Sequence, residues 1–519
     1  MGRRDTEERR FENPAKSSPT VKKRRGSRRN NRKQKMNLFG VILTILHAVA
    51  SVLFIGTLIV IDLLPMKYLT LVIVIIAALF LMVFFRQKSK KGRSVLAAIL
   101  SIIMILLLGV GSYYIGKVNG AMGAVTGGGS YKIDNMVVAV LQEDPAETIQ
   151  DAKDYSFGVQ YHLGGDDVTQ AVESINEELG KQIATTEYAS LQEQAAALQD
   201  GGVQAIIYNE GYTGMLEEAF EGFESKVKII YSHQIEKEIT TEVTDVKEFA
   251  ITEDVFSVYI SGIDVYGPIS TNSRSDVNII ATVNPKTHQI LLTTTPRDYY
   301  VPIPGVSGGQ RDKLTHAGIY GVDASMATLE SIYETDIQFY ARVNFTSVIE
   351  IVDQLGGVDV YSEYAFTTLH GNLNVQKGMN HFNGEEALAF SRERYSLPGG
   401  DNQRGKNQQA VIVAMIKKMV SPQILMSASG IIDSVSGNVQ TNMTEDQIQS
   451  LIKMQLNEGG AWNIYSVAAT GTGESNYTYS MPGTPLYVMN PNQDSVNQII
   501  ELMNRVENGE TLEGSEVAQ

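Results

Sequence analysis

Three arginines lie close together in the carboxy-terminal half of this chain. Arg392, Arg394 and Arg404 fall within thirteen positions, although the 426 residues from 94 to 519 contain only eight arginines. Each guanidinium is permanently charged and holds phosphate or carboxylate oxygens two at a time. The segment therefore predicts a site for an anionic ligand.

The spacing of the first two arginines depends on the local backbone. If residues 391–395 are extended, Arg392 and Arg394 point to the same face, because strand side chains alternate. If these residues are helical, the two side chains lie about 200° apart and cannot converge. The alternative to an anion site is a surface ion-pair cluster with Glu393 and Asp401, which would contribute little free energy.

Arg404 belongs to the next element. The Pro-Gly-Gly sequence at 398–400 predicts a turn, and a helical pattern follows it. Arg404 and Gln408 share one face of that helix if it begins near Gln403. Both pieces could then close over one anion.

Two aspartates complete the candidate chemistry. Asp264 and Asp276 stand at or near the ends of predicted strands. They could share one hard divalent cation, which would also contact the oxygens of the anion. The alternative is that both are ordinary turn or capping residues.

Alternating and buried patterns predict an α/β domain that positions these residues. The pattern predicts strands at 255–263, 275–283 and 289–295, and helices at 318–333, 346–355, 384–390 and 407–420. Asn383 is a candidate N-cap for the third helix. Polar residues at strand ends of an α/β layer are where sites tend to form.

A second α/β pattern precedes this domain. Strands are predicted at 136–141, 203–208 and 227–231, and helices at 167–179 and 188–198. The region contains no arginine and no catalytic constellation. We expect an accessory domain, whose ligand the sequence does not reveal.

Charge is distributed unevenly along the 519 residues. Residues 1–35 carry a net charge of +10, whereas residues 94–519 carry −30. A basic arm is compatible with nucleic-acid contact. It is also the usual cytoplasmic flank of a membrane span, and we favour that interpretation because apolar spans follow directly.

Three apolar stretches, at 38–61, 68–85 and 95–115, are each long enough to cross a bilayer as a helix. The connection at 86–93 is basic, so the positive-inside rule places it and the amino-terminal arm in the cytoplasm. An odd number of spans then places the remaining chain outside. The absence of cysteine is consistent with export.

The fold class expected is α/β, with three transmembrane helices, a small α/β accessory domain and a larger α/β domain with a central sheet flanked by helices. The expected division is a basic cytoplasmic arm, three transmembrane helices, a Gly-rich flexible linker, the accessory domain, the larger domain and a disordered tail, at 1–37, 38–116, 117–130, 131–250, 251–507 and 508–519.

Several motifs in one order resemble the LytR–CpsA–Psr family, over about residues 250–420. They read TTTPRDYYVPIPG, RDKLTHAGIYG, ARVNFTSVIEIVDQLGGVDV and FNGEEALAFSRERYSLPGGDNQRGKNQQ. The three-span arrangement is similar to that of capsule-associated members. The resemblance implies a central sheet flanked by helices, with an apolar pocket for a polyprenyl chain.

The resemblance also implies a function. Family members transfer a glycopolymer, either capsular polysaccharide or teichoic acid, from a polyprenyl-pyrophosphate carrier to peptidoglycan. They act in the cytoplasmic membrane of Gram-positive bacteria, with the catalytic domain outside. Carried onto this chain, the pyrophosphate-binding residues are Arg274, Arg297, Arg392, Arg394, Arg404 and Gln408, with Lys313 as a further member. Asp264 and Asp276 match the magnesium-associated aspartates, so Mg²⁺ is the expected cofactor.

Arginine forks and a metal ion suit phosphoryl transfer, because they stabilise charge on the non-bridging oxygens. Asp401 is a candidate general base for the incoming hydroxyl, and a helix cap or arginine partner is the alternative. Two other functions stay open: a non-catalytic regulator that binds the lipid-linked glycan, and a transcriptional attenuator. Hydrolysis by water is a variant of the transferase. Membrane lipid is an expected partner, nucleic acid is not, and the oligomeric state stays open.

Overall fold

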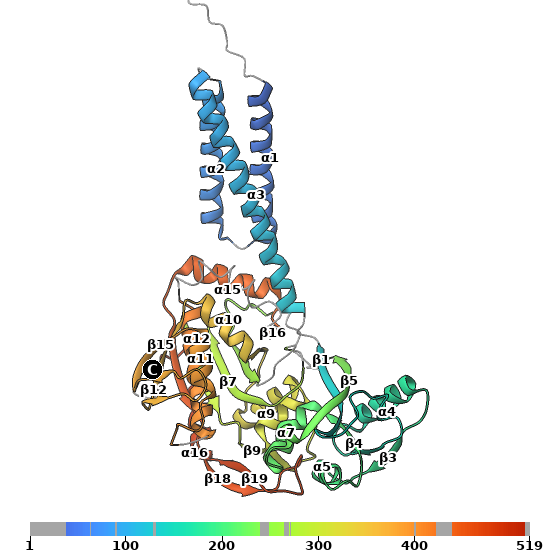
Figure 1. The fold of residues 1–519 in the computed structure, drawn as a ribbon. Helices are drawn as coiled ribbons and strands as arrows, with labels where there is room; N and C mark the ends of the chain where they lie inside the picture. The colour runs from blue at the N-terminus through green and yellow to red at the C-terminus, as the bar shows by residue number, and fades with distance from the viewer. Residues whose placement is uncertain are drawn as a thin grey trace, which may run out of the picture.

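The computed structural model describes residues 38–62, 64–88, 91–127, 131–238, 249–263, 269, 271–398, 401–421 and 439–513. Three long apolar helices form the amino-terminal part: α1 (Leu38–Ile61), α2 (Met66–Gln87) and α3 (Lys91–Gly127). Each has the length and composition to cross a membrane, as the sequence analysis predicts. They stand together above the globular part of the chain (Figure 1). We therefore describe the protein as membrane-anchored.

The third helix continues beyond the apolar stretch. The span itself is Val95–Lys117, but α3 stays helical to Gly127. A flexible linker over 117–130 is thus wrong for its first eleven residues. Adding residues to an existing helix costs far less than starting a new one, so the glycines in this segment do not end it.

The accessory domain is built on a five-stranded sheet with the order β3-β2-β4-β1-β5. Its strands are β1 (Tyr131–Leu141), β2 (Ser156–Val159), β3 (Ala184–Glu187), β4 (Ala205–Asn209) and β5 (Val227–Glu238). Its helices are α4 (Gly165–Leu179), α5 (Leu191–Gln199), α6 (Thr213–Ala219) and α7 (Phe223–Lys226), and a 3-10 turn at Glu210–Tyr212 precedes α6. This confirms the predicted α/β pattern.

The larger domain has a six-stranded mixed sheet with the order β16-β11-β6-β7-β8-β17. Its strands are β6 (Phe256–Ile263), β7 (Ser275–Asn284), β8 (Gln289–Thr295), β11 (Phe339–Asn344), β16 (Val439–Thr441) and β17 (Asn463–Ala468). Strand β7 runs antiparallel to both of its neighbours, β6 and β8. The next strands outward, β11 and β17, pair parallel to β6 and β8.

Helices cover both faces of this sheet. One face packs against α10 (Phe345–Gln354), α11 (Gly384–Arg392) and α12 (Asp401–Met419), and the other against α8 (Leu314–Tyr320), α9 (Val322–Tyr333) and α16 (Gln493–Glu507). Strand β7 shows why, since Ile279 contributes to the first core and Ile280 to the second. Strand side chains alternate between faces, so a strand that is buried at every position, as β7 is, needs both faces covered.

Local sequence explains several boundaries. The predicted helix at 318–333 is two helices, because the chain turns at Gly321 with φ 128°. Helix α11 begins at the capping box formed by Asn383 and Glu386, as the N-cap prediction requires. Helix α12 begins at Asp401, so the predicted start at 407 is wrong. The polar residues before 407 form the first turns of this helix.

Residues 391–395 do not form an extended segment. Ser391 and Arg392 are the last residues of α11, and the chain becomes extended only at Glu393. The Glu393 carboxylate accepts hydrogen bonds from the backbone N–H groups of Leu369, Arg394 and Ser396. These bonds hold the loop after α11 in place.

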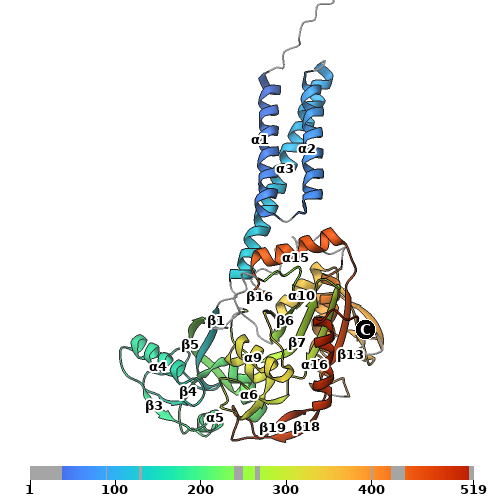
Figure 2. The ribbon, with the colours of Figure 1, turned by 180° about the vertical axis from the view of Figure 1, so that it is seen from behind.

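Short strands and one further helix complete the domain. Three two-stranded sheets pair β9 (Tyr300–Pro302) with β10 (Arg311–Lys313), β12 (Val358–Ser362) with β15 (Gly378–Phe382), and β13 (Phe366–Thr367) with β14 (Asn374–Val375); a fourth pairs β18 (Gly471–Asn476) with β19 (Leu486–Pro491). Helix α15 (Glu445–Glu458) lies beneath the membrane helices in both views (Figures 1 and 2).

Helix α15 contacts the connection between α1 and α2. Lys453 pairs with Asp62, and the Lys67 ammonium donates to the backbone carbonyl of Asn457 at 2.9 Å. The larger domain therefore lies at the end of the helix bundle that carries this first connection, away from the connection between α2 and α3.

Candidate active site

One edge of the central sheet gathers most of the predicted residues. Because β7 runs antiparallel to both neighbours, its first residues lie beside the last residues of β6 and β8. Arg274 immediately precedes β7, and Asp276 is the second residue of β7. Arg297 follows the end of β8 by two residues. The strand topology thus brings side chains from separate segments to a common edge.

Three cations converge at this edge, and we call Arg274, Arg297 and Lys313 the cationic cradle. The side chains of Arg297 and Lys313 are 9% and 3% exposed. Nη1 of Arg297 donates to Oδ1 of Asp276 at 2.6 Å, and Nζ of Lys313 lies 2.8 Å from Oδ1 of Asp298. Buried cations are stable only when paired in this way.

A carboxylate of the accessory domain also enters the cradle. Oε1 of Glu218, in α6, accepts from Nη1 of Arg274 at 2.8 Å and from Nη2 of Arg297 at 3.3 Å. Its Oε2 accepts from Nζ of Lys313 at 3.1 Å. Burial by itself would raise the pKa of Glu218, but the three cations outweigh burial and lower that pKa from 4.5 to about 2.

Asp276 is held as an anion by the same charges. It is 3% exposed, and Thr315 also donates to its Oδ1, at 3.4 Å. Burial raises the pKa of Asp276, while the charges of Arg297, Arg274 and Arg404 lower it by more, so the net shift is downward. The influence of Arg404 shows that α12 brings its charge toward the cradle.

A second group lies along α11 and α12. Arg392, Arg404 and Gln408 line a cavity of about 580 Å³, together with Ile349, His370, Gly371, Glu385, Leu388 and Ala389. Arg404 and Gln408 are four residues apart in α12 and share this face, as the spacing predicts. Gln408 is 3% exposed, and its Oε1 accepts no hydrogen bond from the residues that the structure describes.

An apolar seam lies behind Gln408, between the sheet and the helices. It is a hollow of about 20 Å³ lined chiefly by aliphatic residues of β6, β7, β11, α10 and α12: Gly262, Ile263, Val277, Val343, Val348, Val411 and Ile412, with Asn344, Ser391 and Gln408 as its polar members. The resemblance implied an apolar pocket for a prenyl chain. The seam shares Gln408 with the cavity beside α11 and α12, and it is narrow.

On the other side of α12 a cavity of about 370 Å³ adjoins the cradle. Asp276, Arg297 and Asp298 line it from the sheet edge, and Gly405, Lys406 and Gln409 line it from α12. The amino-terminal half of α12 therefore separates two hollows, each containing predicted anion-binding residues.

The remaining predicted residues are placed differently. Arg394 is exposed, with its guanidinium carbon 5.7 Å from the centre of the Tyr395 ring. Asp264 lies outside the described residues, and so does the side chain of Asp401, whose backbone begins α12. Their predicted roles stay predictions.

The sequence analysis missed two carboxylates that contact the cradle. Asp298 follows Arg297 directly in the PRD motif, so its pairing with Lys313 could have been anticipated. Glu218 carries no such signal, because it lies 56 residues before Arg274 and in another domain. A buried Asp312–His316 pair, with Nδ1 of His316 2.6 Å from Oδ1 of Asp312, was also not anticipated.

The carboxylates bear on the expected metal. Among the residues that the structure describes, no group of three or more His, Asp or Glu side chains has the arrangement of a metal site. Magnesium, however, is commonly bound through one or two carboxylates, with phosphate oxygens and water completing the shell. Asp276 is a buried, anionic carboxylate beside the cradle, so it fits the part of a protein carboxylate that binds Mg²⁺.

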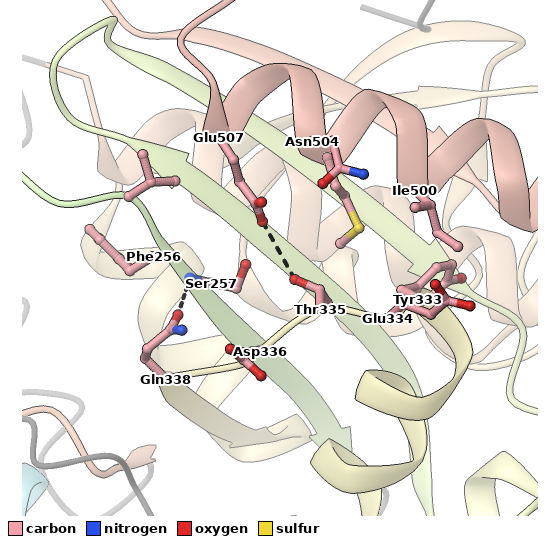
Figure 3. Close-up of a pocket in the computed structure, with 12 residues that line it drawn as sticks. Phe256, Ser257, Tyr333, Glu334, Thr335, Asp336, Gln338, Ile500, Asn504 and Glu507 are labelled. Carbon is pink, nitrogen blue, oxygen red and sulfur yellow. Dashed lines mark hydrogen bonds between the residues drawn. The ribbon is translucent and has the colours of Figure 1, made fainter.

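Another hollow lies at the opposite end of β6 and differs in charge. It has a volume of about 320 Å³ and carries Glu334, Asp336 and Glu507 on its lining (Figure 3). Thr335 donates to Glu507 at 3.5 Å, and the Ser257 N–H donates to Gln338 at 2.8 Å. None of the described residues that line this hollow is a lysine or arginine, so the hollow does not suit a phosphate.

Comparison with known proteins extends the resemblance. The model of the LytR_cpsA_psr family matches residues 221–503, which is more than half of the chain and begins within the accessory domain. Proteins named polyisoprenyl-teichoic acid–peptidoglycan teichoic acid transferase TagU are 37% identical over 202 residues in Bacillus cereus and 38% identical over 202 residues in Bacillus mycoides. Each match covers 39% of this chain and 64% of the relative's length.

Solved structures include TagV of B. subtilis, which is 26% identical with a TM-score of 0.40; the match covers 50% of this chain and 99% of that one. The family match coincides with the sheet edge, the cradle and helix α12 described above. The chain belongs to the LytR_cpsA_psr family.

Proposed function

We propose that this protein is a phosphotransferase that moves a glycopolymer from a polyprenyl-pyrophosphate carrier to peptidoglycan, outside the cytoplasmic membrane. The observation that carries the proposal is the convergence of Arg274, Arg297 and Lys313 at the sheet edge beside Asp276. The names of the curated relatives, teichoic acid transferases acting between a polyisoprenyl carrier and peptidoglycan, support the same reaction.

The reaction needs what this edge provides. A hydroxyl of the acceptor attacks the phosphorus that carries the glycan, forming a new P–O bond, while the bond from that phosphorus to the bridging oxygen breaks. Polyprenyl phosphate leaves with the bridging oxygen, and the hydroxyl proton passes to a base. Fixed guanidinium and ammonium groups stabilise the negative charge on the phosphoryl oxygens throughout.

Two hollows beside α12 carry cations that could bind phosphoryl groups, and the first contains both Arg297 and Lys406. Arg297 faces one hollow, and Arg392 and Arg404 face the other. Gln408 lies between the second hollow and the apolar seam, so its amide could bind a phosphoryl oxygen where the prenyl chain begins. Since the seam is narrow, the chain would enter only as α10 or α12 moves away from the sheet.

Mg²⁺ is part of the proposal. Asp276 would hold it, with Asp264 as the second carboxylate, and the bound ion would neutralise charge on the pyrophosphate. Asp401 is proposed as the base, because it begins α12 beside the residues of the second hollow. A helix cap is the competing role for Asp401.

Topology supports access to the substrate. The basic arm and the basic second connection would lie in the cytoplasm, and the globular part would lie outside. The contacts of α15 with the first connection keep this part beside the bilayer. The headgroup of a lipid carrier would be presented at that surface.

The test uses the full chain in detergent or nanodiscs, with Mg²⁺, a lipid-pyrophosphate glycan and peptidoglycan. We expect a covalent glycan–peptidoglycan product, lost in Arg392→Ala and after chelation of the metal. Arg311→Ala is the matched control, because Arg311 is an exposed arginine stacked near Tyr300.

Other outcomes have defined meanings. Release of free glycan phosphate without attachment would assign hydrolysis instead. Binding of the lipid with no turnover of any kind would contradict the transferase and favour a regulator of assembly.

A further inference from the structure

The accessory domain contributes a charged group to the cradle of the larger domain. Glu218 contacts Arg274, Arg297 and Lys313 at once, which are three of the cations proposed to hold the pyrophosphate. Arginine and lysine donors bind carboxylate and phosphate oxygens in the same way, so Glu218 uses donors that a phosphoryl group would need. The cradle therefore already contains an anion supplied by the chain itself.

This placement is built into the contact between the domains. Arg274 lies so close to α6 that a Cβ on Gly214 would stand 2.2 Å from its Nη2. Nη1 of Arg274 also donates to the Gly214 carbonyl at 3.4 Å. A larger residue at position 214 would push this guanidinium away from the helix.

Further bonds fix the accessory domain beside the cradle. The N–H of Asn272 donates to the carbonyl of Ile133 at 2.8 Å, and the Asn272 amide donates to Asp134 at 3.0 Å. Nζ of Lys132 lies 3.2 Å from Asp323 of α9. Helix α6 is thus held on the side of the accessory domain that faces the larger domain (Figure 2).

The charges show what Glu218 does to a ligand. The cradle has three positive side chains, and Asp276 and Asp298 already neutralise two of them. With Glu218 in place the group is neutral, and without it one positive charge remains. An incoming phosphate must therefore displace Glu218 or bear its repulsion at close range.

We propose that Glu218 is a specificity-determining residue, an internal anion that admits a pyrophosphate to the cradle and rejects a monophosphate. The inference rests on the proposed function and concerns the discrimination between its lipid substrate and its lipid product.

The geometry explains why the two ligands would differ. A monophosphate can replace only the bonds that Glu218 already makes, so it gains little on entering. A pyrophosphate has a second phosphoryl group, which can reach Lys406, because this lysine lines the same cavity of about 370 Å³ as Arg297. These added contacts offset the cost of displacing the carboxylate.

The same competition would favour product release. Transfer breaks the bond between the glycan-bearing phosphorus and the bridging oxygen. The prenyl monophosphate leaves with that oxygen. This product has lost its second phosphoryl group, so Glu218 can regain its three partners. Return of the carboxylate would clear the cradle for the next carrier.

The test compares the binding of a short-chain prenyl pyrophosphate and the matching prenyl monophosphate to the full chain in detergent. Variants are Glu218→Gln, which keeps the shape without the charge, and Glu221→Gln as an exposed control on the loop after α6. We expect Glu218→Gln to raise monophosphate affinity by about tenfold, equal to about 1.4 kcal/mol. Pyrophosphate affinity should rise by less than about threefold, and the control should match the native chain.

An equal gain for both ligands, or no change for either, would overturn the inference while leaving the proposed function standing. If neither ligand bound the native chain or any variant, the proposed function itself would fail.

A second measurement covers a poorly folded glutamine variant. Glu218→Asp keeps the charge but shortens the side chain, so we expect monophosphate affinity between those of the native chain and Glu218→Gln. In the attachment assay, added prenyl monophosphate should inhibit Glu218→Asp more strongly than the native chain. Equal inhibition of the two proteins would count against the inference.

Discussion

Removing Arg297 should cost both stability and activity, and the two costs can be separated. Its guanidinium is 9% exposed and bonds to Asp276, which is 3% exposed. In Arg297→Ala the Asp276 carboxylate would keep its burial and lose its main partner. Breaking a buried ion pair from one side costs about 3–5 kcal/mol, because the remaining charge is left uncompensated.

The double variant Arg297→Ala/Asp276→Asn removes that remaining charge. We expect it to regain at least half of the stability lost by Arg297→Ala, since neutral asparagine tolerates burial better. It should not regain polymer attachment, because both the phosphate-binding fork and the carboxylate are gone. The pair thus distinguishes a structural ion pair from a functional one.

The chain supplies its own reporter for this measurement. Trp462 is the sole tryptophan, and it lies in the larger domain, where it donates to Gln455 at 2.6 Å and packs near His288. Its fluorescence should follow the unfolding of this domain alone. A loss of about 3–5 kcal/mol corresponds to a fall in Tm of roughly 6 to 20 °C for a domain of this size.

Two results would refute the reasoning. If Arg297→Ala melted with the native chain, the ion pair would carry no stability. If the double variant were as unstable as the single one, the loss would come from packing of the arginine stem rather than from an uncompensated charge. Arg311→Ala, an exposed arginine, should leave Tm unchanged.

Three further predictions concern pH and packing. The pKa of Glu218 is lowered to about 2, so the stability that its charge contributes is present above its ordinary pKa of 4.5 and is lost as the pH falls toward 2. The difference in Tm between the native chain and Glu218→Gln should therefore shrink between pH 4.5 and pH 2. A difference that stayed constant would contradict this prediction. Gly318→Ala should lower Tm, because the new Cβ would stand 2.6 Å from the Ser273 carbonyl oxygen and 2.7 Å from the Ser275 nitrogen. The control Gly405→Ala in α12 meets nothing within 4 Å and should raise the free energy of unfolding by up to about 1 kcal/mol. If Gly318→Ala melted at a higher temperature than Gly405→Ala, this account of the packing would be wrong. Gln408→Met should raise Tm, because the buried Oε1 accepts no bond among the described residues, and should weaken binding of the lipid pyrophosphate; a variant that is both less stable and fully active would exclude the role given to this amide.

Local patterns predicted the parts of the fold that depend on nearby residues. The prediction of β8 at 289–295 agrees with the structure, and Asn383 caps α11 as expected, because alternation and capping are read from a few adjacent positions. The helix at 318–333 was predicted without its break. A Cβ at Gly321, where φ is 128°, would stand 2.2 Å from Oδ1 of Asp323 and 2.7 Å from Nζ of Lys132 in the accessory domain, and no local pattern contains the second of these neighbours.

The site divides in the same way. Arg297 and Asp276 could be placed together, because antiparallel strands bring their ends to a common edge. Arg392 joins Arg404 through the end of one helix and the start of another, and not through an extended segment at 391–395, which was one of the two alternatives left open by the sequence. Glu218 could not be found, because its position depends on how two domains pack.

Helix α3 and helix α15 together hold the globular part at a set distance from the membrane helices. The first passes from the bilayer to Gly127 without a break, and the second is bonded to the connection between α1 and α2. On the proposed function, the enzyme therefore has a short working radius and cannot follow wall material as it moves outward. Glycopolymer would therefore be attached to each peptidoglycan strand soon after its synthesis, while the strand is still close to the membrane. The length of the helical anchor would then set how long a new strand remains within reach of the active site.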